Sequence, residues 1–265
     1  YTLKNLGIRS SVVSAIGDDS KGQMINNYLE TNEFDTQNIR TIPNKLSGYC
    51  ITLLDETGER TFLTYKGCED FFEIDMVNET QIKRTNYVYL TGYYLVNRDY
   101  HKDIIELIDK IVISGGKIIF DPGPLIEYVD SNMILDVLKR TYILTPNKVE
   151  LNILKNSANT SMDFKKWAFE NGVSFIIEKL GSEGTNIWSQ NSNFYVPAYK
   201  VNVTDTTGAG DSFAGGLIYA HINNFEILEA VKFASACGAF TTTFTGPHGT
   251  FDINDIKQLI EKGEI

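Results

Sequence analysis

The 265-residue sequence predicts an α/β fold, in which a doubly wound, mostly parallel sheet is flanked by helices and accompanied by a small β-lid. Three observations predict it. Short β-rich runs alternate with segments of helical periodicity, one pair of β-rich runs breaks this alternation, and only helical patterns follow residue 210. Strands that alternate with helices are typical of a parallel sheet covered by helices on both faces.

The start of the chain, residues 1–6, has the pattern of a helix's last turns and is followed by Gly7, a residue type that commonly ends helices. Residues 11–16 then read as a buried strand. Because a natural domain rarely begins inside a helix, we expect about 30–50 further residues before Tyr1, which would give strand 11–16 a neighbour.

A hairpin pattern interrupts the alternation at residues 49–55 and 60–65, two β-rich runs joined by a turn, residues 56–59, that contains Gly58. Such a hairpin cannot be a parallel crossover. We assign residues 47–66 to the β-lid beside the main sheet, and the alternative is an ordinary antiparallel edge ribbon.

From residue 87 onward, strand and helix patterns follow one another in order. The predicted strands are 87–91, 117–121, 142–145, 174–179 and 185–189, and the predicted helices are 98–113, 131–140, 147–155, 162–171, 210–221, 226–243 and 252–262. No internal repeat or linker-like stretch divides the chain, so we expect residues 1–265 to form a single domain.

The composition narrows the range of partners. Hydrophobic residues make up 42% and charged residues 22%, an ordinary globular balance. The formal net charge of -10 argues against nucleic-acid binding, which draws on clustered Lys and Arg, and it favours a small-molecule partner. No apolar run approaches the roughly 20 residues of a membrane helix, and no signal-peptide pattern opens the chain. We therefore expect a cytoplasmic protein without a membrane partner.

Cysteine and histidine give little support to a metal site. Cys50, Cys68 and Cys237 are odd in number, widely spaced and without a C-x-x-C pair, so we interpret them as reduced packing residues rather than as catalytic or metal-binding ones. The three histidines are equally scattered, which argues against a His-based metal site or a Ser-His-Asp triad.

Residues 203–216, VTDTTGAGDSFAGG, lead directly into an apolar helix and form the most informative segment. Gly208 and Gly210 lack Cβ atoms, so the backbone can turn tightly and bring its N–H groups against a ligand at the helix start. Those donors and the positive end of the helix dipole suit a phosphoryl group in transfer. Asp211, in the first helical turn, can accept a proton from an attacking hydroxyl.

Other interpretations of this segment compete. The glycines can simply form a flexible loop before a helix whose first turn carries an acidic residue, without binding a ligand. A dinucleotide-binding loop is disfavoured because Phe213 occupies the third glycine position of G-x-G-x-x-G, and a P-loop is disfavoured because no Gly-Lys-Ser/Thr follows.

The full string, rather than the G-x-G within it, resembles the C-terminal signature of the ribokinase-like (PfkB) carbohydrate kinase family, D-T-T-G-A-G-D-x-F-x-x-G. The resemblance implies ATP and Mg²⁺ as cofactors. It also implies that Asp211 is the base that deprotonates the acceptor hydroxyl, and that the amides around Gly208, Ala209 and Gly210 form an anion hole.

Further matches concern the nucleotide and its cations. The resemblance makes Thr206 a nucleotide contact, and in members that depend on a monovalent cation such as K⁺, residues matching Asp205 and Thr207 help hold the ion. Asn147 and Glu150 resemble the family's N-x-x-E motif, which organises Mg²⁺ and its water around the phosphates. Taken alone, this pair favours a near capping box, worth about 1 kcal/mol, but its place at a strand-to-helix turn in the expected order favours organisation of Mg²⁺.

Two other segments resemble the walls of the family's ATP site. Lys179, Gly181 and Gly184 match the strand and G-x-x-G loop that border ATP, although a plain β-turn also fits. Gly238 matches the helix beside adenine, where small residues equally suit close helix packing. Asp121 ends a predicted strand, where open parallel sheets place ligand groups, but the family's usual D-x-N has a glycine in its third position here.

The resemblance spans the chain from Tyr1, while the family pattern has one more portion ahead, with a sugar-binding Asp and a Gly-Gly loop. We therefore expect an ATP-dependent sugar kinase with a ribokinase-like fold, whose β-lid pairs two subunits into a homodimer. A nucleoside kinase is the alternative within the enzyme class, and a non-catalytic sugar-binding protein is the alternative outside it.

Overall fold

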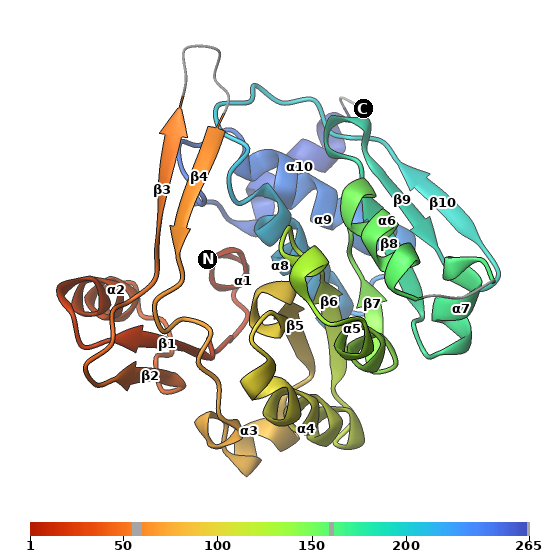
Figure 1. Ribbon diagram of the computed structural model, residues 1–265. Helices are drawn as coiled ribbons and strands as arrows, with labels where there is room; N and C mark the ends of the chain where they lie inside the picture. The colour runs from red at the N-terminus through yellow and green to blue at the C-terminus, as the bar shows by residue number, and fades with distance from the viewer. Residues whose placement is uncertain (55–59, 159–161, 264–265) are drawn as a thin grey trace.

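The main sheet has six strands in the order β10-β9-β8-β7-β6-β5 in the computed structural model, which describes residues 1–54, 60–158 and 162–263 (Figure 1). The strands are β5 (Tyr87–Thr91), β6 (Lys117–Asp121), β7 (Thr141–Leu144), β8 (Phe175–Lys179), β9 (Thr185–Trp188) and β10 (Asn193–Val196). Strands β5 to β8 run parallel to one another, whereas β9 is antiparallel to β8 and β10 is antiparallel to β9. The predicted α/β fold with a mostly parallel sheet is confirmed, and β10 is an addition to the predicted strands.

Helices cover both faces of this sheet (Figure 1). One face carries α4 (His101–Ile113), α5 (Ser131–Leu138), α6 (Lys148–Ser157) and α7 (Phe164–Glu170), and the other carries α8 (Ala209–Ile222), α9 (Ile227–Thr241) and α10 (Ile253–Lys262). Alternation along β6 separates the two cores, because Ile118 and Phe120 pack into one and Ile119 into the other.

The first part of the chain forms α1 (Thr2–Asn5), which packs against α8, and then β1 (Ser14–Gly17), α2 (Ser20–Thr31) and β2 (Ile39–Ile42). Strand β1 pairs in parallel with β2, so the expectation that this strand has no neighbour is wrong. It also begins later than predicted, since Ser11 makes only an isolated bridge to Asp35. The pairing was missed because β2 is short and includes the polar residues Arg40 and Thr41.

The predicted hairpin is confirmed as a two-stranded antiparallel sheet of its own, formed by β3 (Tyr49–Leu54) and β4 (Arg60–Tyr65). Its predicted turn, residues 56–59, lies outside the described residues. The remaining elements are α3 (Glu79–Arg84) and the short 3₁₀ helices η1 (Ile74–Met76), η2 (Gly92–Leu95), η3 (Arg98–Tyr100), η4 (Ile126–Tyr128) and η5 (Gly181–Glu183).

The cysteines are all free, and Cys68 and Cys237 are buried as predicted. Cys50 is exposed on β3, so its expected packing role is wrong; the strand belongs to a two-stranded ribbon outside the main cores. Among the described helices, none is long and apolar enough to cross a membrane.

Candidate active site

A cavity of about 170 Å³ lies where the carboxyl ends of β5, β6 and β8 meet the amino ends of α6 and α8. Its lining is Tyr89, Thr91, Tyr93, Asp121, Gly123, Pro124, Glu150, Lys179, Gly210 and Asp211. Parallel α/β sheets typically hold ligands outside the carboxyl ends of their strands. The cavity therefore brings together four of the residues singled out by their motifs, Glu150, Lys179, Gly210 and Asp211.

The start of α8 forms one wall of the cavity. Gly208 is its N-cap with φ of +78°, and no side chain among the described residues caps the helix. The Ala209 amide donates to the carbonyl of Thr206 at 3.3 Å. By helix geometry, the first-turn amides at Gly210 and Asp211 have no acceptor inside the helix. They are available to an anion at this wall.

Asp211 lies in that first turn at the cavity wall. Asp211 is exposed to solvent on one side, and its other side faces protein atoms of the cavity lining. This partial burial and the negative charge of Asp121 raise the pKa of Asp211 above its ordinary value, while the ammonium of Lys179 opposes the rise. A carboxylate with a raised pKa, beside amides that have no acceptor inside their helix, is a suitable acceptor for a hydroxyl proton.

The loop before α8 is braced by Asp205. Its Oδ1 accepts hydrogen bonds from the backbone N and the Oγ1 of Thr207, at 2.9 and 2.7 Å, and its Oδ2 accepts from the Gly246 amide at 3.0 Å. Thr206 is exposed in the same loop. These contacts fix the approach to the helix start, whatever further ligand Asp205 and Thr207 hold.

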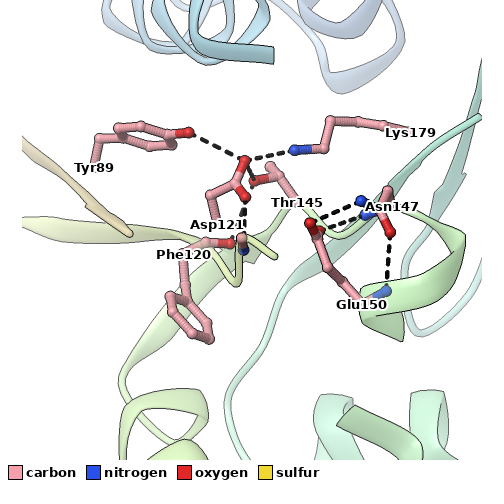
Figure 2. A network of polar contacts seen from close by, with 8 residues as sticks. Tyr89, Phe120, Asp121, Thr145, Asn147, Glu150 and Lys179 are labelled. Carbon is pink, nitrogen blue, oxygen red and sulfur yellow. Dashed lines mark hydrogen bonds and ion pairs between the residues drawn. The ribbon is translucent and has the colours of Figure 1, made fainter. Parts of the chain in front are cut away.

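Asn147 and Glu150 form a complete capping box at the start of α6. Figure 2 shows both Glu150 oxygens turned toward Asn147, whose backbone N and Nδ2 donate to them at 2.8 and 2.7 Å. Burial raises the pKa of Glu150, and the hydrogen bond from the Asn147 backbone opposes the rise. Glu150 nevertheless lines the cavity, so the capping geometry is compatible with an oxygen donor for a cation.

Asp121 and Lys179 form an ion pair across the cavity floor, with the Lys179 Nζ 2.5 Å from Asp121 Oδ2 (Figure 2). The same oxygen accepts from the hydroxyls of Tyr89 and Thr145, at 3.1 and 3.3 Å. Burial and the charge of Asp121 raise the pKa of the Tyr89 phenol, which remains a donor. Sequence analysis placed Asp121 at the end of a strand but predicted no partner for it, and it singled out neither Tyr89 nor Thr145.

The three glycines predicted to border the nucleotide, Gly181, Gly184 and Gly238, lie outside the cavity lining. Gly181 and Gly184 have φ of +62° and +100° in the connection from β8 to β9, as a turn requires. Gly238 packs α9 against α8, because a Cβ atom there would stand 3.0 Å from the Ala209 carbonyl oxygen. Close helix packing, which the sequence left open for Gly238, is thus what the structure provides.

The lid hairpin contacts a residue of the cavity lining just after its second strand, β4. The Nζ of Lys66, just after β4, donates to the backbone carbonyl of Tyr93 at 3.3 Å. Tyr93 belongs to η2 and lines the cavity. Residues 47–66 are therefore connected to the site at their base.

Comparison with known proteins identifies the family of this chain. The model of the pfkB family of carbohydrate kinases matches residues 1–253, and the chain belongs to that family. It is therefore a phosphotransferase that acts on a hydroxyl group of a carbohydrate.

Individual relatives are distant but extend over most of the chain. An uncharacterised sugar kinase of Archaeoglobus fulgidus is 27% identical over 242 residues, which cover 89% of this chain and 92% of that protein. Fructokinase-1 of Zea mays is 25% identical, covering 98% and 85%. A putative ribokinase II from E. coli, solved in its apo form, has a TM-score of 0.87 with 26% identity, covering 98% of this chain and 86% of that one.

Proposed function

We propose that this chain transfers the γ-phosphoryl group of ATP to a hydroxyl of a sugar, with Asp211 as the base and the amides of Gly208, Ala209 and Gly210 as the anion hole. The observation that carries the proposal is the position of Asp211 in the uncapped first turn of α8, on the wall of the cavity. One carboxylate and several aligned amides supply the two functions that phosphoryl transfer asks of a protein.

Two groups at this wall have separate roles in the transfer: Asp211 takes the proton of the acceptor hydroxyl, and the amides stabilise negative charge on the phosphoryl group. As the acceptor oxygen attacks the γ-phosphorus, its proton passes to the Asp211 carboxylate, the bond from the γ-phosphorus to the bridging oxygen breaks, and ADP leaves. The charge on the equatorial oxygens of the phosphoryl group is stabilised by amides at the start of α8 and by the positive end of the helix dipole. Fixed geometry, rather than covalent participation by the protein, lowers the barrier.

Asn147, Glu150, Thr206 and Lys179 are the proposed nucleotide-side residues. Lys179 offers an ammonium for the phosphates, and the oxygens of Glu150 suit the water shell of Mg²⁺. A bound Mg²⁺ would neutralise phosphate charge. The putative E. coli ribokinase II has also been solved in complex with ATP and Mg²⁺, and its likeness to this chain supports the assignment.

A monovalent cation such as K⁺ is the remaining part of the nucleotide-side proposal. Asp205 and Thr207 place carboxylate and hydroxyl oxygens together just before the anion-hole amides. A cation held there would add positive charge next to the loop. Replacing K⁺ by tetramethylammonium in the assay tests this, because a dependence on K⁺ should appear as lost turnover.

We place this activity in one domain formed by residues 1–265, with residues 47–66 as its substrate-side lid. The partner is a small-molecule sugar rather than a nucleic acid, in keeping with the net charge of -10. Because ATP is the donor, we place the protein in the cytoplasm.

The nucleoside alternative deserves direct comparison, because aminoimidazole riboside kinase of Salmonella typhimurium is 26% identical over 252 residues. ADP release should be measured with purified protein against fructose, ribose, other hexoses and pentoses, and a set of nucleosides. We expect turnover with a sugar and none with the Asp211→Asn variant. Turnover with nucleosides alone would replace the sugar assignment, and sugar binding without turnover would favour a non-catalytic binding protein.

A further inference from the structure

We propose that Asp121 is a positioning residue for phosphoryl transfer, which holds the Lys179 ammonium beside the donor phosphates and keeps it from pairing with Asp211. The inference rests on the proposed function, since it assumes that Asp211 is the base. It assigns to Asp121 a role that acts through another side chain, without contact to the reacting atoms.

The Asp121 carboxylate is fixed from several sides (Figure 2). Besides the ion pair with Lys179 and the hydroxyls of Tyr89 and Thr145 on Oδ2, the amide of Gly123 donates to Oδ1 at 3.2 Å. Its side chain is only 10% exposed. A buried carboxylate with this many donors has one orientation, so the ammonium that it binds is also fixed.

Lys179 has other carboxylates within the same cavity. Asp121, Glu150 and Asp211 all line it, and Lys179 is the one cation among the lining residues of the described chain. Its Nζ also lies near the catalytic loop, 4.0 Å from where a Cβ atom on Gly210 would stand. Without Asp121, attraction to Asp211 or Glu150 would therefore compete for this ammonium.

A Lys179–Asp211 pair would work against catalysis. The ammonium would occupy the oxygens that must receive the hydroxyl proton, and it would stabilise the charged carboxylate, which weakens the base. It would also remove the cation from the phosphate side of the cavity. Tyr89 and Thr145 cannot substitute for Asp121, since both are hydroxyl donors to the same carboxylate and carry no negative charge.

The competing explanation is that the pair only ties β6 to β8, as many buried ion pairs do. A double-mutant cycle separates the two explanations. Asp121→Asn, Lys179→Met and the double variant are compared for kcat and for the KM of ATP and of the sugar identified with the wild-type enzyme.

We expect Asp121→Asn to lower kcat by about tenfold or more, as is common when the orientation of a catalytic group is lost. In the Lys179→Met background the same substitution should change kcat by less than about twofold, because Asp121 acts through Lys179. Effects that multiply in the double variant would overturn the proposal. So would an Asp121→Asn enzyme with wild-type kcat.

Asp109→Asn is the matched control. Asp109 pairs with Arg140 through two hydrogen bonds of 2.6 and 2.9 Å, outside the cavity lining. Loss of that pair should lower the melting temperature and leave kcat unchanged. If Asp109→Asn lowered kcat as much as Asp121→Asn does, a general loss of stability would explain both, and the proposal would fall.

A crystal structure of ligand-free Asp121→Asn gives a readout that is independent of turnover. We expect the Lys179 Nζ to move within hydrogen-bonding distance of Asp211 or Glu150, and an ammonium that stays beside residue 121 would contradict the proposal. An inactive wild-type protein would instead overturn the proposed function, and the position of Lys179 in this crystal would still decide whether Asp121 restrains it.

Discussion

Gly208 lies against Pro247 so closely that a Cβ atom added to Gly208 would stand 1.9 Å from the Pro247 carbonyl oxygen. The contact fixes the N-cap of α8 against residues 246–249, and the hydrogen bond from the Gly246 amide to Asp205 reinforces it. Any side chain at residue 208 must therefore displace backbone on which the proposed anion hole depends.

Replacing Gly208 by Ala should lower the free energy of unfolding by more than the strain of a positive φ alone. The positive φ costs about 1 kcal/mol, and forcing the Pro247 carbonyl away adds about 1–3 kcal/mol. We expect the melting temperature to fall by about 5–15 °C and kcat to fall by about a hundredfold or more. Differential scanning calorimetry and the ADP-release assay measure both.

Gly7→Ala is the control for that variant. Gly7 has a similar φ of +75°, but an added Cβ atom meets nothing within 4 Å. Because only backbone strain is added, the melting temperature of Gly7→Ala should fall by about 2–4 °C, and its kcat should be normal. Equal effects of the two substitutions would mean that the Pro247 contact has no importance of its own.

Asp211→Asn should retain the fold and nucleotide binding while lowering kcat by several orders of magnitude, because the amide cannot accept the hydroxyl proton. Its stability should not fall at pH 7. An acid whose pKa is raised by folding contributes stability below its unfolded pKa, and this stability is lost as pH rises through the folded pKa. At neutral pH the charged Asp211 carboxylate therefore does not stabilise the folded state. Turnover within tenfold of wild type would exclude Asp211 as the base.

The raised pKa of Asp211 also predicts the pH dependence of the reaction. The base must be ionised, so kcat/KM for the sugar should fall as pH drops through a pKa above the ordinary value near 3.8. In Asp121→Asn one cause of the rise is gone, and this acidic limb should move to lower pH. A limb that is unchanged in Asp121→Asn would show that Asp121 does not act on the base electrostatically.

Much of the fold follows from local patterns in the sequence. The strands β5 and β6 were predicted with their observed bounds, because each is a short apolar run between a helix pattern and a turn. The position of Asp211 in the first turn of a helix followed from Gly208 and the apolar run after it. These features depend on residues close together in the chain.

Other features depend on contacts that no local pattern contains. Lys179 is 58 residues from Asp121, and Tyr89 is 32 residues away, so their pairing exists only once β5, β6 and β8 lie in one sheet. Strand β10 was missed for a related reason. It is a four-residue edge strand whose first three residues are exposed, and its pairing with β9 defines it more than its composition does.

Glu150→Gln separates the two roles of its carboxylate. If Glu150 organises the water shell of Mg²⁺, loss of its charge should raise the Mg²⁺ concentration for half-maximal activity by about tenfold, the low end for such outer-shell residues. Titration of activity with Mg²⁺ at saturating ATP measures this. If Glu150→Gln lowers the melting temperature but leaves the Mg²⁺ dependence of activity normal, the Glu150 carboxylate only caps α6.

Asp255→Asn is the control for the capping role. Asp255 occupies the same position of a complete capping box at the start of α10, where its Oδ2 accepts from the Asp252 amide at 2.9 Å. Because it does not line the cavity, it should lower the melting temperature slightly and leave the Mg²⁺ titration unchanged.

The lid should pair two subunits into a homodimer. The hairpin register places Tyr49 opposite Tyr65 and Ile51 opposite Leu63, and Leu53 lies on the same face as Tyr49 and Ile51. All five residues are 40–52% exposed, so they form one apolar face on a hairpin whose two strands, within the described part of the chain, pair only with each other. Phe62, also expected to contribute, has a side chain outside the described part of the structure.

Light scattering after size-exclusion chromatography, at micromolar protein, should give about twice the chain mass of 29.8 kDa. Ile51→Asp puts a charge at the centre of the apolar face and should yield monomers, because an unpaired charge buried in an apolar interface is costly. Ile113→Asp is the control, since Ile113 is 85% exposed at the end of α4, outside the lid, and its replacement should leave the dimer intact. A wild-type protein that is monomeric throughout this range, or an Ile51→Asp variant that remains dimeric, would show that the lid does not join subunits.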